Sequence, residues 1–297
     1  MNQGPSWLGI GAQRCGTTWF TDLLIQHPQM DVAGKGDAAT GGKKEHHMLY
    51  RYGLIHDWSP DTRDEYQNTF TNDKIRLGEF TPFYLRASWI CELTAEALPD
   101  DAPIIVLVRD PIDRFASAIR HEMTVATRRY RKYLKATGKI KRRLMDMAAL
   151  GRRGARQEAI VEMIRGNAQS PAEMFRDATW LRFVGSDASW GGMYAAQLAA
   201  WTAVLPADRF IVIQYEKLRE DPQRYADLIW RRLGLEPVSM TGVDLRSRGS
   251  TNSTKWLPED HPHVVRALQQ MYRSDAKRLA DQFDIDLALW KRTMTDA

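Results

Sequence analysis

The stretch Gly11-Ala-Gln-Arg-Cys-Gly-Thr-Thr18 decides the fold of this chain. Two glycines separated by four residues are typical of a phosphate loop, in which the backbone turns tightly and presents N–H groups to phosphate oxygens. The loop follows an apolar run, Trp7–Gly11, that predicts a buried strand, and it precedes a helical pattern over residues 17–26. A helix N-terminus adds a partial positive charge. Strand, loop and helix in this order predict an anion-binding turn.

Further apolar runs in the sequence predict additional strands and therefore a sheet. Ile104–Val108 and Phe210–Gln214 are continuous apolar runs, typical of parallel strands covered on both faces. Weaker strand patterns occur at 30–33 and 75–79, and Asp110-Pro111 starts a helix after the second strong run. Alternating strands and helices predict a three-layer α/β fold, with a central, mostly parallel sheet flanked by helices as in P-loop nucleotide triphosphatases.

A basic, helical insertion at about 124–190 interrupts this alternation, and we expect one domain over 1–297 that contains it. Between residues 128 and 156 there are twelve Lys or Arg and one acid, Asp146. A solvated helix face explains such a run, and so does a surface for an anionic acceptor or anionic lipid. Nucleic acid is not expected, because few aromatic residues lie between the charges.

Composition sets outer bounds on the protein. The chain has 297 residues, 43% of them hydrophobic, with a net charge of +5, so a packed core is expected. Cys15 and Cys91 are the two cysteines and provide no disulfide framework. Residues 1–11 lack a basic, apolar signal pattern, and no run approaches the ~18 apolar residues of a membrane span. We therefore expect a cytoplasmic protein.

The phosphate loop differs from that of a nucleotide triphosphatase. Thr17 stands at the position of the lysine that such a loop requires, and the cation lies earlier, at Arg14. The strand ending at Val108 leads into Arg109 before Asp110, so a magnesium-binding aspartate is not evident. The loop is expected to bind phosphate without a required metal. A P-loop kinase or NTPase remains the alternative.

A second anion site is predicted at the carboxyl end of the strand Ile104–Val108. Arg109 lies at the edge where ligands bind in open α/β sheets, and Ser117 follows eight residues later. An arginine fork and a hydroxyl can hold one phosphate together. Alternatively, Arg109 pairs with Asp110 or Asp113, and Ser117 is a packing residue. Two phosphate sites indicate a ligand with two separated phosphate groups.

These motifs together resemble the sulfotransferases that use 3′-phosphoadenosine 5′-phosphosulfate (PAPS). Residues 11–19 are similar to the family's 5′-phosphosulfate loop, 108–117 to its 3′-phosphate motif, and 214–222 to a later segment whose tyrosine lies near the adenine. The resemblance implies PAPS as co-substrate and no metal. The residues it implies for binding are Arg14, Cys15, Gly16, Thr17, Thr18, Trp19, Arg109, Ser117 and Tyr215. The family's late Arg-Lys-Gly element over the 3′-phosphate is absent as such, and either Arg248 and Gly249 or Lys255 is its equivalent.

The segment 43–50, Lys-Lys-Glu-His-His-Met-Leu-Tyr, resembles the Glu-x-His-aromatic stretch of glycan (heparan-type) sulfotransferases. By that resemblance Glu45 is the base that takes the acceptor proton, and His47 matches the motif's histidine. His46 is the alternative base, since the reference pKa of histidine is about 6.5. Arg14 would stabilise the leaving phosphate. A solvated polar loop is the non-catalytic alternative.

The segment 77–84 resembles the part of the family that lines the acceptor cleft. Glu79 stands there in place of a more usual cation, which argues against a sulfated polysaccharide as acceptor. The acceptor is expected to be a hydroxyl or amine of a glycan, a glycolipid or a small metabolite. A non-catalytic protein that docks on an anionic surface through residues 128–156 is the other alternative.

Overall fold

The computed structural model describes residues 4–33, 45–70, 75–119, 121, 187–240 and 262–295. The basic run 128–156 lies outside the described residues, as do Arg248, Gly249 and all but the last four positions of the expected insertion. The chain divides into two compact units. The first consists of Met1–Asp110, Met193–Ser247 and Ser274–Lys291, and the second of Pro111–Gly192, Arg248–Arg273 and Arg292–Ala297.

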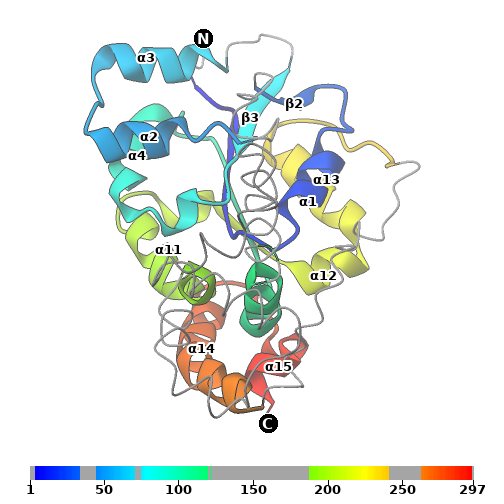
Figure 1. Ribbon diagram of the computed structural model, residues 1–297. Coiled ribbons are helices and arrows are strands. Elements are labelled where there is room, and N and C mark those ends of the chain that lie inside the picture. Colours follow the sequence, from blue (N-terminus) through cyan, green and yellow to red (C-terminus); the bar gives the residue numbers. More distant parts are fainter. Residues whose placement is uncertain are drawn as a thin grey trace, which may run out of the picture. The chain divides into compact units, whose positions relative to one another are not determined.

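Five parallel strands form the sheet of the first unit, in the order β2-β3-β1-β4-β5 (Figure 1). The bounds are β1 Trp7–Gly11, β2 Met30–Val32, β3 Arg76–Phe80, β4 Ile104–Val108 and β5 Phe210–Gln214. Every residue of β1 and β4 is buried. The strong strand predictions are confirmed at their bounds, while β2 ends one residue earlier than predicted and β3 is shifted by one residue at both ends.

The strand order brings two loops to one point of the sheet. The chain leaves β1 toward β2 and β3 on one side, and later fills the other side with β4 and β5. Such a reversal leaves a crevice at the carboxyl ends of the two strands that flank it. β1 pairs directly with β4, and the N–H of Ala12 continues the pairing to the carbonyl of Leu107 at 2.7 Å. The phosphate loop and Arg109 therefore leave the sheet side by side.

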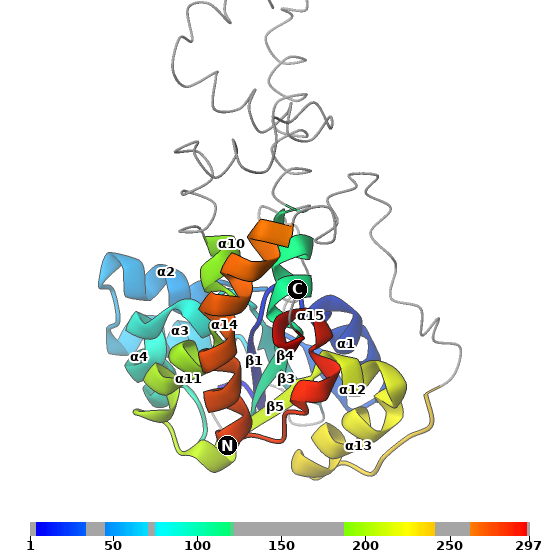
Figure 2. The same ribbon diagram turned by 90° about the horizontal axis from the view of Figure 1, so that it is seen from below.

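Helices cover both faces of this sheet, which confirms the expected α/β class (Figures 1 and 2). On one face, Trp230 of α13 donates its indole N–H to the carbonyl of Leu24, where α1 ends, at 3.1 Å. On the other, Trp201 of α11 donates to the carbonyl of Leu85 at 2.9 Å. Each indole thus packs its ring in the core while its N–H is satisfied.

None of the described helices combines the length and the apolar character needed to cross a membrane. Their bounds are α1 Thr17–Leu24, α2 Met48–Ile55, α3 Pro60–Asn68, α4 Cys91–Ala97, α10 Asp187–Trp190, α11 Tyr194–Thr202, α12 Tyr215–Glu220, α13 Pro222–Arg232, α14 Pro262–Gln282 and α15 Lys291–Met294. Residues 111–119 are also helical, as predicted from Asp110-Pro111. Short 3₁₀ turns occur at Tyr84–Arg86, Ser88–Ile90, Ala207–Arg209 and Leu287–Leu289.

Helix α3 begins at a capping box. The Ser59 hydroxyl accepts from the N–H of Thr62 at 3.3 Å, and the Thr62 hydroxyl accepts from the N–H of Ser59 at 2.9 Å. Pro60 occupies the first helical position, where a missing N–H costs nothing. The local sequence alone therefore defines where this helix starts.

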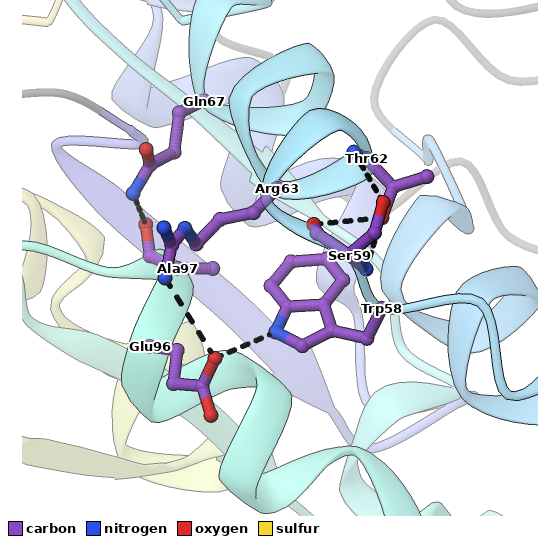
Figure 3. Close-up of polar contacts among 7 residues, drawn as sticks. All are labelled: Trp58, Ser59, Thr62, Arg63, Gln67, Glu96 and Ala97. Atoms are coloured by element: carbon purple, nitrogen blue, oxygen red, sulfur yellow. Dashed lines mark hydrogen bonds and ion pairs between the residues drawn. The ribbon is translucent and has the colours of Figure 1, made fainter.

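Polar side chains then attach α3 to α4 (Figure 3). Glu96 accepts from the indole N–H of Trp58 at 2.9 Å and lies 3.9 Å from the guanidinium of Arg63. Gln67 donates to the carbonyl of Ala97 at 3.1 Å. These contacts hold α3 in the orientation that turns its buried face toward the end of β3.

The C-terminal part of the first unit attaches to β5 through one side chain. The Gln214 amide donates to the carbonyl of Asp286 and accepts from its N–H, both at 2.9 Å. Gln214 is 1% exposed, whereas Asp286 is exposed, so both hydrogen bonds are partly buried. One turn later, Lys217 contacts the Asp284 carboxylate at 3.1 Å. Residues 284–290 are thereby held against the start of α12.

We predict that Gln214→Leu lowers the free energy of unfolding by about 2 kcal/mol, because it removes both hydrogen bonds to the Asp286 backbone, although the Asp286 carbonyl still accepts from the N–H of Leu289 at 3.2 Å. Gln67→Leu is the matched control, since it removes one half-buried hydrogen bond and should cost about 1 kcal/mol or less. Urea denaturation followed by tryptophan fluorescence measures both. Equal losses in the two variants would show that the Asp286 contact does not anchor the C-terminal segment.

Candidate functional site

The phosphate loop has the backbone that its glycines predict. Gly16 is the N-cap of α1 and has φ of 83°, a left-handed conformation that glycine adopts without steric cost. A Cβ at this position would lie 2.6 Å from Cε2 of Tyr215, so the close approach of that ring also requires glycine. Arg14 is left-handed too, with φ of 73°. The loop is therefore tightly curved around the start of α1.

The N-terminus of α1 supplies the electrostatics of an anion site. The first turn of α1 contains no acidic residue, so its dipole is not neutralised from within the helix. Thr17 is buried and Thr18 is exposed, and both lie in this first turn. Cys15 is fully buried, with its Sγ atom 3.5 Å from the hydroxyl of Tyr194. The loop thus points the Cys15 thiol inward.

Tyr194 joins the loop to the end of β4. Its hydroxyl donates to the carbonyl of Arg109 at 2.9 Å and accepts from the N–H of Arg109 at 3.3 Å. Because its single proton is used on that carbonyl, the Cys15 thiol is the donor in the third contact. Tyr194 is fully buried. One hydroxyl therefore sets the spacing between the two predicted anion elements.

The ring of Tyr215 lies between the same two elements. The guanidinium carbon of Arg109 is 5.1 Å from the ring centroid, within cation–π range, and Gly16 packs against the ring edge. Trp19 meets the ring edge-on at 6.3 Å. The structure thus brings together Gly16, Trp19, Arg109 and Tyr215, which the sequence placed at one site.

Trp19 carries an unsatisfied donor beside Tyr215. Its indole N–H is buried, and it finds no hydrogen-bond partner among the described residues. A buried donor left unpaired costs about 1–3 kcal/mol, and a ligand acceptor placed there would recover that cost.

Glu216 supports the other side of the β4 turn. Its carboxylate accepts from the N–H of Asp110 at 3.0 Å and from the indole N–H of Trp290 at 3.2 Å. Burial raises the pKa of the Glu216 carboxyl, and the hydrogen bond from Asp110 opposes that shift. Asp113, one of the partners considered for Arg109, forms an ion pair with Arg292 in the second unit.

Glu45 and His47, the residues matched to the acceptor-base motif, lie together. Nε2 of His47 is 3.3 Å from Oε2 of Glu45, and both side chains are partly exposed, at 22% and 25%. The His47 ring packs edge-on against Phe83 at 5.8 Å. His47 is left-handed, with φ of 57°, and α2 starts directly after it. The pair is accessible to solvent and held by its neighbours.

His46 points away from this pair. Its Nε2 contacts the carbonyl of Ala33, which requires a proton on that nitrogen, and its ring packs on Phe70 at 5.7 Å. Its backbone N–H donates to the carboxylate of Glu79 at 3.2 Å. The arrangement gives His46 an anchoring position, whereas the Glu45 side chain is 25% exposed.

The expected position of Glu79 in an open acceptor cleft is wrong. Its side chain is fully buried, and its oxygens are occupied by donors from the protein. The charge of Glu79 therefore does not face an acceptor, and it carries no argument against a polysaccharide.

The remaining predicted residues are distributed as follows. Ser117 is buried in the helical residues 111–119 of the second unit, so its approach to Arg109 stays a prediction. Arg14 lies in the loop, half-buried. Arg248 and Gly249 lie outside the described residues. The part of the chain that the structure describes contains no group of three or more His, Cys, Asp or Glu arranged to hold a metal ion.

Sequence reasoning missed Tyr194, Glu216 and Trp290. All three act through hydrogen bonds to residues far away in the chain, which no local pattern reveals. Glu216 carried a usable signal, because an acidic residue directly after an apolar strand and an aromatic is unusual unless it has a partner.

Comparisons with known proteins agree with this geometry. The family model described as "Sulfotransferase domain" matches residues 6–258. A human protein, bifunctional heparan sulfate N-deacetylase/N-sulfotransferase 3, is 24% identical over 233 residues. The match covers 78% of this chain and 22% of that protein, so the chain spans about a fifth of its curated relative.

Two solved structures are also similar. A sulfotransferase from Alicyclobacillus acidocaldarius superimposes with a TM-score of 0.56 at 20% identity, covering 97% of this chain and 98% of the other. The sulfotransferase domain of the Synechococcus PCC 7002 olefin synthase has a TM-score of 0.41 at 17% identity, with 96% of each chain covered. The family match spans well over half of the sequence, and the first structure shares the fold. The chain therefore belongs to the sulfotransferase domain family.

Proposed function

We propose that the chain transfers the sulfuryl group of PAPS to a hydroxyl or amine of a glycan, glycolipid or small metabolite. One observation carries this proposal. The phosphate loop follows β1, Arg109 follows β4, and the Glu45 segment is tied to the ends of β2 and β3 through His46. In a parallel sheet these ends share one edge, so donor site and base occupy the same side of the sheet.

The residues present suit a ligand with two phosphate groups. The N–H groups of the loop and of the α1 N-terminus would hold the 5′-phosphosulfate, with the hydroxyls of Thr17 and Thr18. Arg109 and Ser117 would hold the 3′-phosphate, closed over by Arg248 and Gly249. Aromatic rings of Trp19 and Tyr215 would contact the nucleotide, whose acceptors can satisfy the buried indole N–H. Cys15 and Gly16 shape the loop.

The transfer itself needs a base and a cation. The acceptor oxygen or nitrogen forms a bond to sulfur while the bond from sulfur to the bridging phosphate oxygen breaks, and the acceptor proton passes to Glu45. Arg14 stabilises the charge that develops on the leaving 5′-phosphate, and 3′,5′-ADP (PAP) departs. His47, 3.3 Å from Glu45, orients that carboxylate.

A glycan amine or hydroxyl is the first acceptor to test. The name of the human relative specifies a heparan sulfate N-sulfotransferase. Glu45 and His47 stand in the segment that resembles the corresponding segment of such enzymes. The basic run 128–156 suits an anionic acceptor or an anionic lipid surface around it. Incubation with sulfur-labelled PAPS and either N-desulfated heparan oligosaccharides or a cell extract identifies the acceptor by where the label appears.

We predict that PAP raises the melting temperature without Mg²⁺, and that Arg109→Ala removes most of this shift. A ligand that binds only the folded state stabilises a protein by RT ln(1 + L/Kd), where L is the free ligand concentration, so the shift shrinks when Kd rises. Arg219→Ala is the matched control, because its guanidinium also lies near Tyr215, at 5.9 Å, but on the exposed side of α12. It should keep the shift. No PAP shift in the wild-type protein, or a shift with Mg-ATP and phosphate release, would overturn the donor assignment.

Glu45→Gln should reduce transfer from labelled PAPS by about 10²–10⁴-fold, the usual contribution of a general base. The PAP-induced thermal shift should remain, because the donor loop is untouched. His46→Gln should reduce transfer less, since its ring contacts Ala33 and not the acceptor side. The reverse order of the two effects would make His46 the base.

Tyr194→Phe should weaken PAP binding about fivefold, corresponding to about 1 kcal/mol, because one hydroxyl spaces the loop and Arg109. Tyr272→Phe is the control: its buried hydroxyl donates to the Ser189 carbonyl at 2.8 Å in the second unit. Isothermal titration with PAP should show an effect for Tyr194→Phe alone. A similar loss in both variants would indicate general destabilisation.

A further inference from the structure

Glu79 sits at the end of β3 with four hydrogen bonds to its carboxylate. Oε1 accepts from the hydroxyls of Tyr66 at 2.8 Å and Tyr84 at 3.2 Å. Oε2 accepts from the hydroxyl of Thr81 at 2.6 Å and from the backbone N–H of His46 at 3.2 Å. The side chain is 0% exposed. Burial of a carboxylate is strongly unfavourable unless its lone pairs are filled, and here four donors fill them.

The donors come from separate elements. Tyr66 belongs to α3, Tyr84 to the 3₁₀ turn Tyr84–Arg86, and His46 to the segment before α2. Burial, and then the charge of Glu79, raise the pKa of both tyrosines well above its ordinary value. Both hydroxyls therefore keep their protons and donate throughout the working pH range. The carboxylate holds together the elements on one side of the sheet.

His46 connects this buried cluster to the partly exposed residues next to it. Its backbone is held by Glu79, and its ring by the carbonyl of Ala33 at the end of β2. Ala33 is itself bonded to β3, through its N–H to the carbonyl of Gly78 at 2.9 Å. Both attachments of His46 thus end on the sheet. The residues on either side of His46 contact each other, with Nε2 of His47 3.3 Å from Oε2 of Glu45.

We propose that Glu79 is a positioning residue for Glu45, acting through the His46 backbone. The inference rests on the proposed role of Glu45 as the base. His46 is held by one hydrogen bond from its backbone and one from its ring, so the adjacent Glu45 keeps one location relative to the sheet edge. Loss of the Glu79 contact removes the hydrogen bond that holds the His46 backbone, and we expect the Glu45–His47 pair to separate.

The test uses the imidazole nitrogen signals of His47 in ¹⁵N-labelled full-length protein. The chain has seven histidines, and His46→Gln and His47→Gln assign the relevant signals. Glu45→Gln provides the reference for a His47 ring without its carboxylate. Glu79→Leu, which has no acceptor, is expected to move the His47 signals toward that reference. Unchanged His47 signals in folded Glu79→Leu would overturn the proposal.

Two variants separate positioning from general packing. Glu79→Gln should keep the wild-type His47 signals, because its carbonyl oxygen can accept from His46 while its NH₂ group faces tyrosine hydroxyls that also accept. Tyr66→Phe removes a donor from Oε1 and leaves the His46 contact on Oε2, so it should keep them too. Displaced signals in Tyr66→Phe would mean that the signals report core packing, which counts against the proposal.

If Glu79→Leu does not fold, amide exchange in the wild-type protein decides. The His46 N–H should exchange about 100-fold more slowly than in an unstructured peptide, and a rate within about tenfold of the peptide overturns the proposal. PAP-induced thermal shifts are recorded in parallel. Absence of that shift in the wild-type protein contradicts the donor assignment, whereas the His47 signals report on Glu79 in either case.

Discussion

The pairing of β1 with both β3 and β4 is the constraint on which the rest of the first unit depends. Every residue of β1 is buried, so its backbone must be satisfied by neighbours on both sides. The chain fills the sheet first on the β3 side of β1 and later on the β4 side, so the strand order reverses at β1. The phosphate loop begins at that point, and the neighbouring strand ends supply Arg109 on one side and Glu79 on the other.

At this edge of the sheet, the buried Tyr194 hydroxyl and the buried Glu79 carboxylate are each surrounded by hydrogen-bond partners. The Tyr194 hydroxyl uses its proton and both lone pairs, and the Glu79 carboxylate accepts four donors. In a low-dielectric interior such networks are stable only when every member is satisfied, and they then define one geometry. The structure thus places rigid buried networks directly beneath loops that carry partly exposed candidate groups, which is how a site on loops can have precise geometry.

The sequence predicted the sheet better than the contacts beneath it. Strands β1, β4 and β5 were read correctly because continuous apolar runs have few other interpretations, and Asp110-Pro111 marked the next helix for stereochemical reasons. The helix α12 was not anticipated, since its six residues are too few to show a period. Glu79 was misplaced because successive residues of a strand point to opposite faces of the sheet, and the sequence does not tell which face α3 covers.

The same distinction holds for the candidate site. Spacing identified the loop and Arg109, because phosphate binding uses backbone and charge at fixed local positions. Which of the two adjacent histidines meets Glu45 could not be read from the sequence, because that depends on the left-handed turn at His47 and on the carbonyl of Ala33. Tyr194 and Trp290 reach the site through tertiary packing alone.

The attachment of residues 284–290 to β5 and α12 has a further meaning. Those residues lie beyond position 258, where the family match ends, yet Asp286 and Trp290 contact the two residues on either side of Tyr215. On the proposed function, in which Tyr215 contacts the donor nucleotide, a sequence change in this tail would alter donor affinity while every recognisable motif stays intact. Donor affinity would then depend on a part of the chain that lies outside the family match.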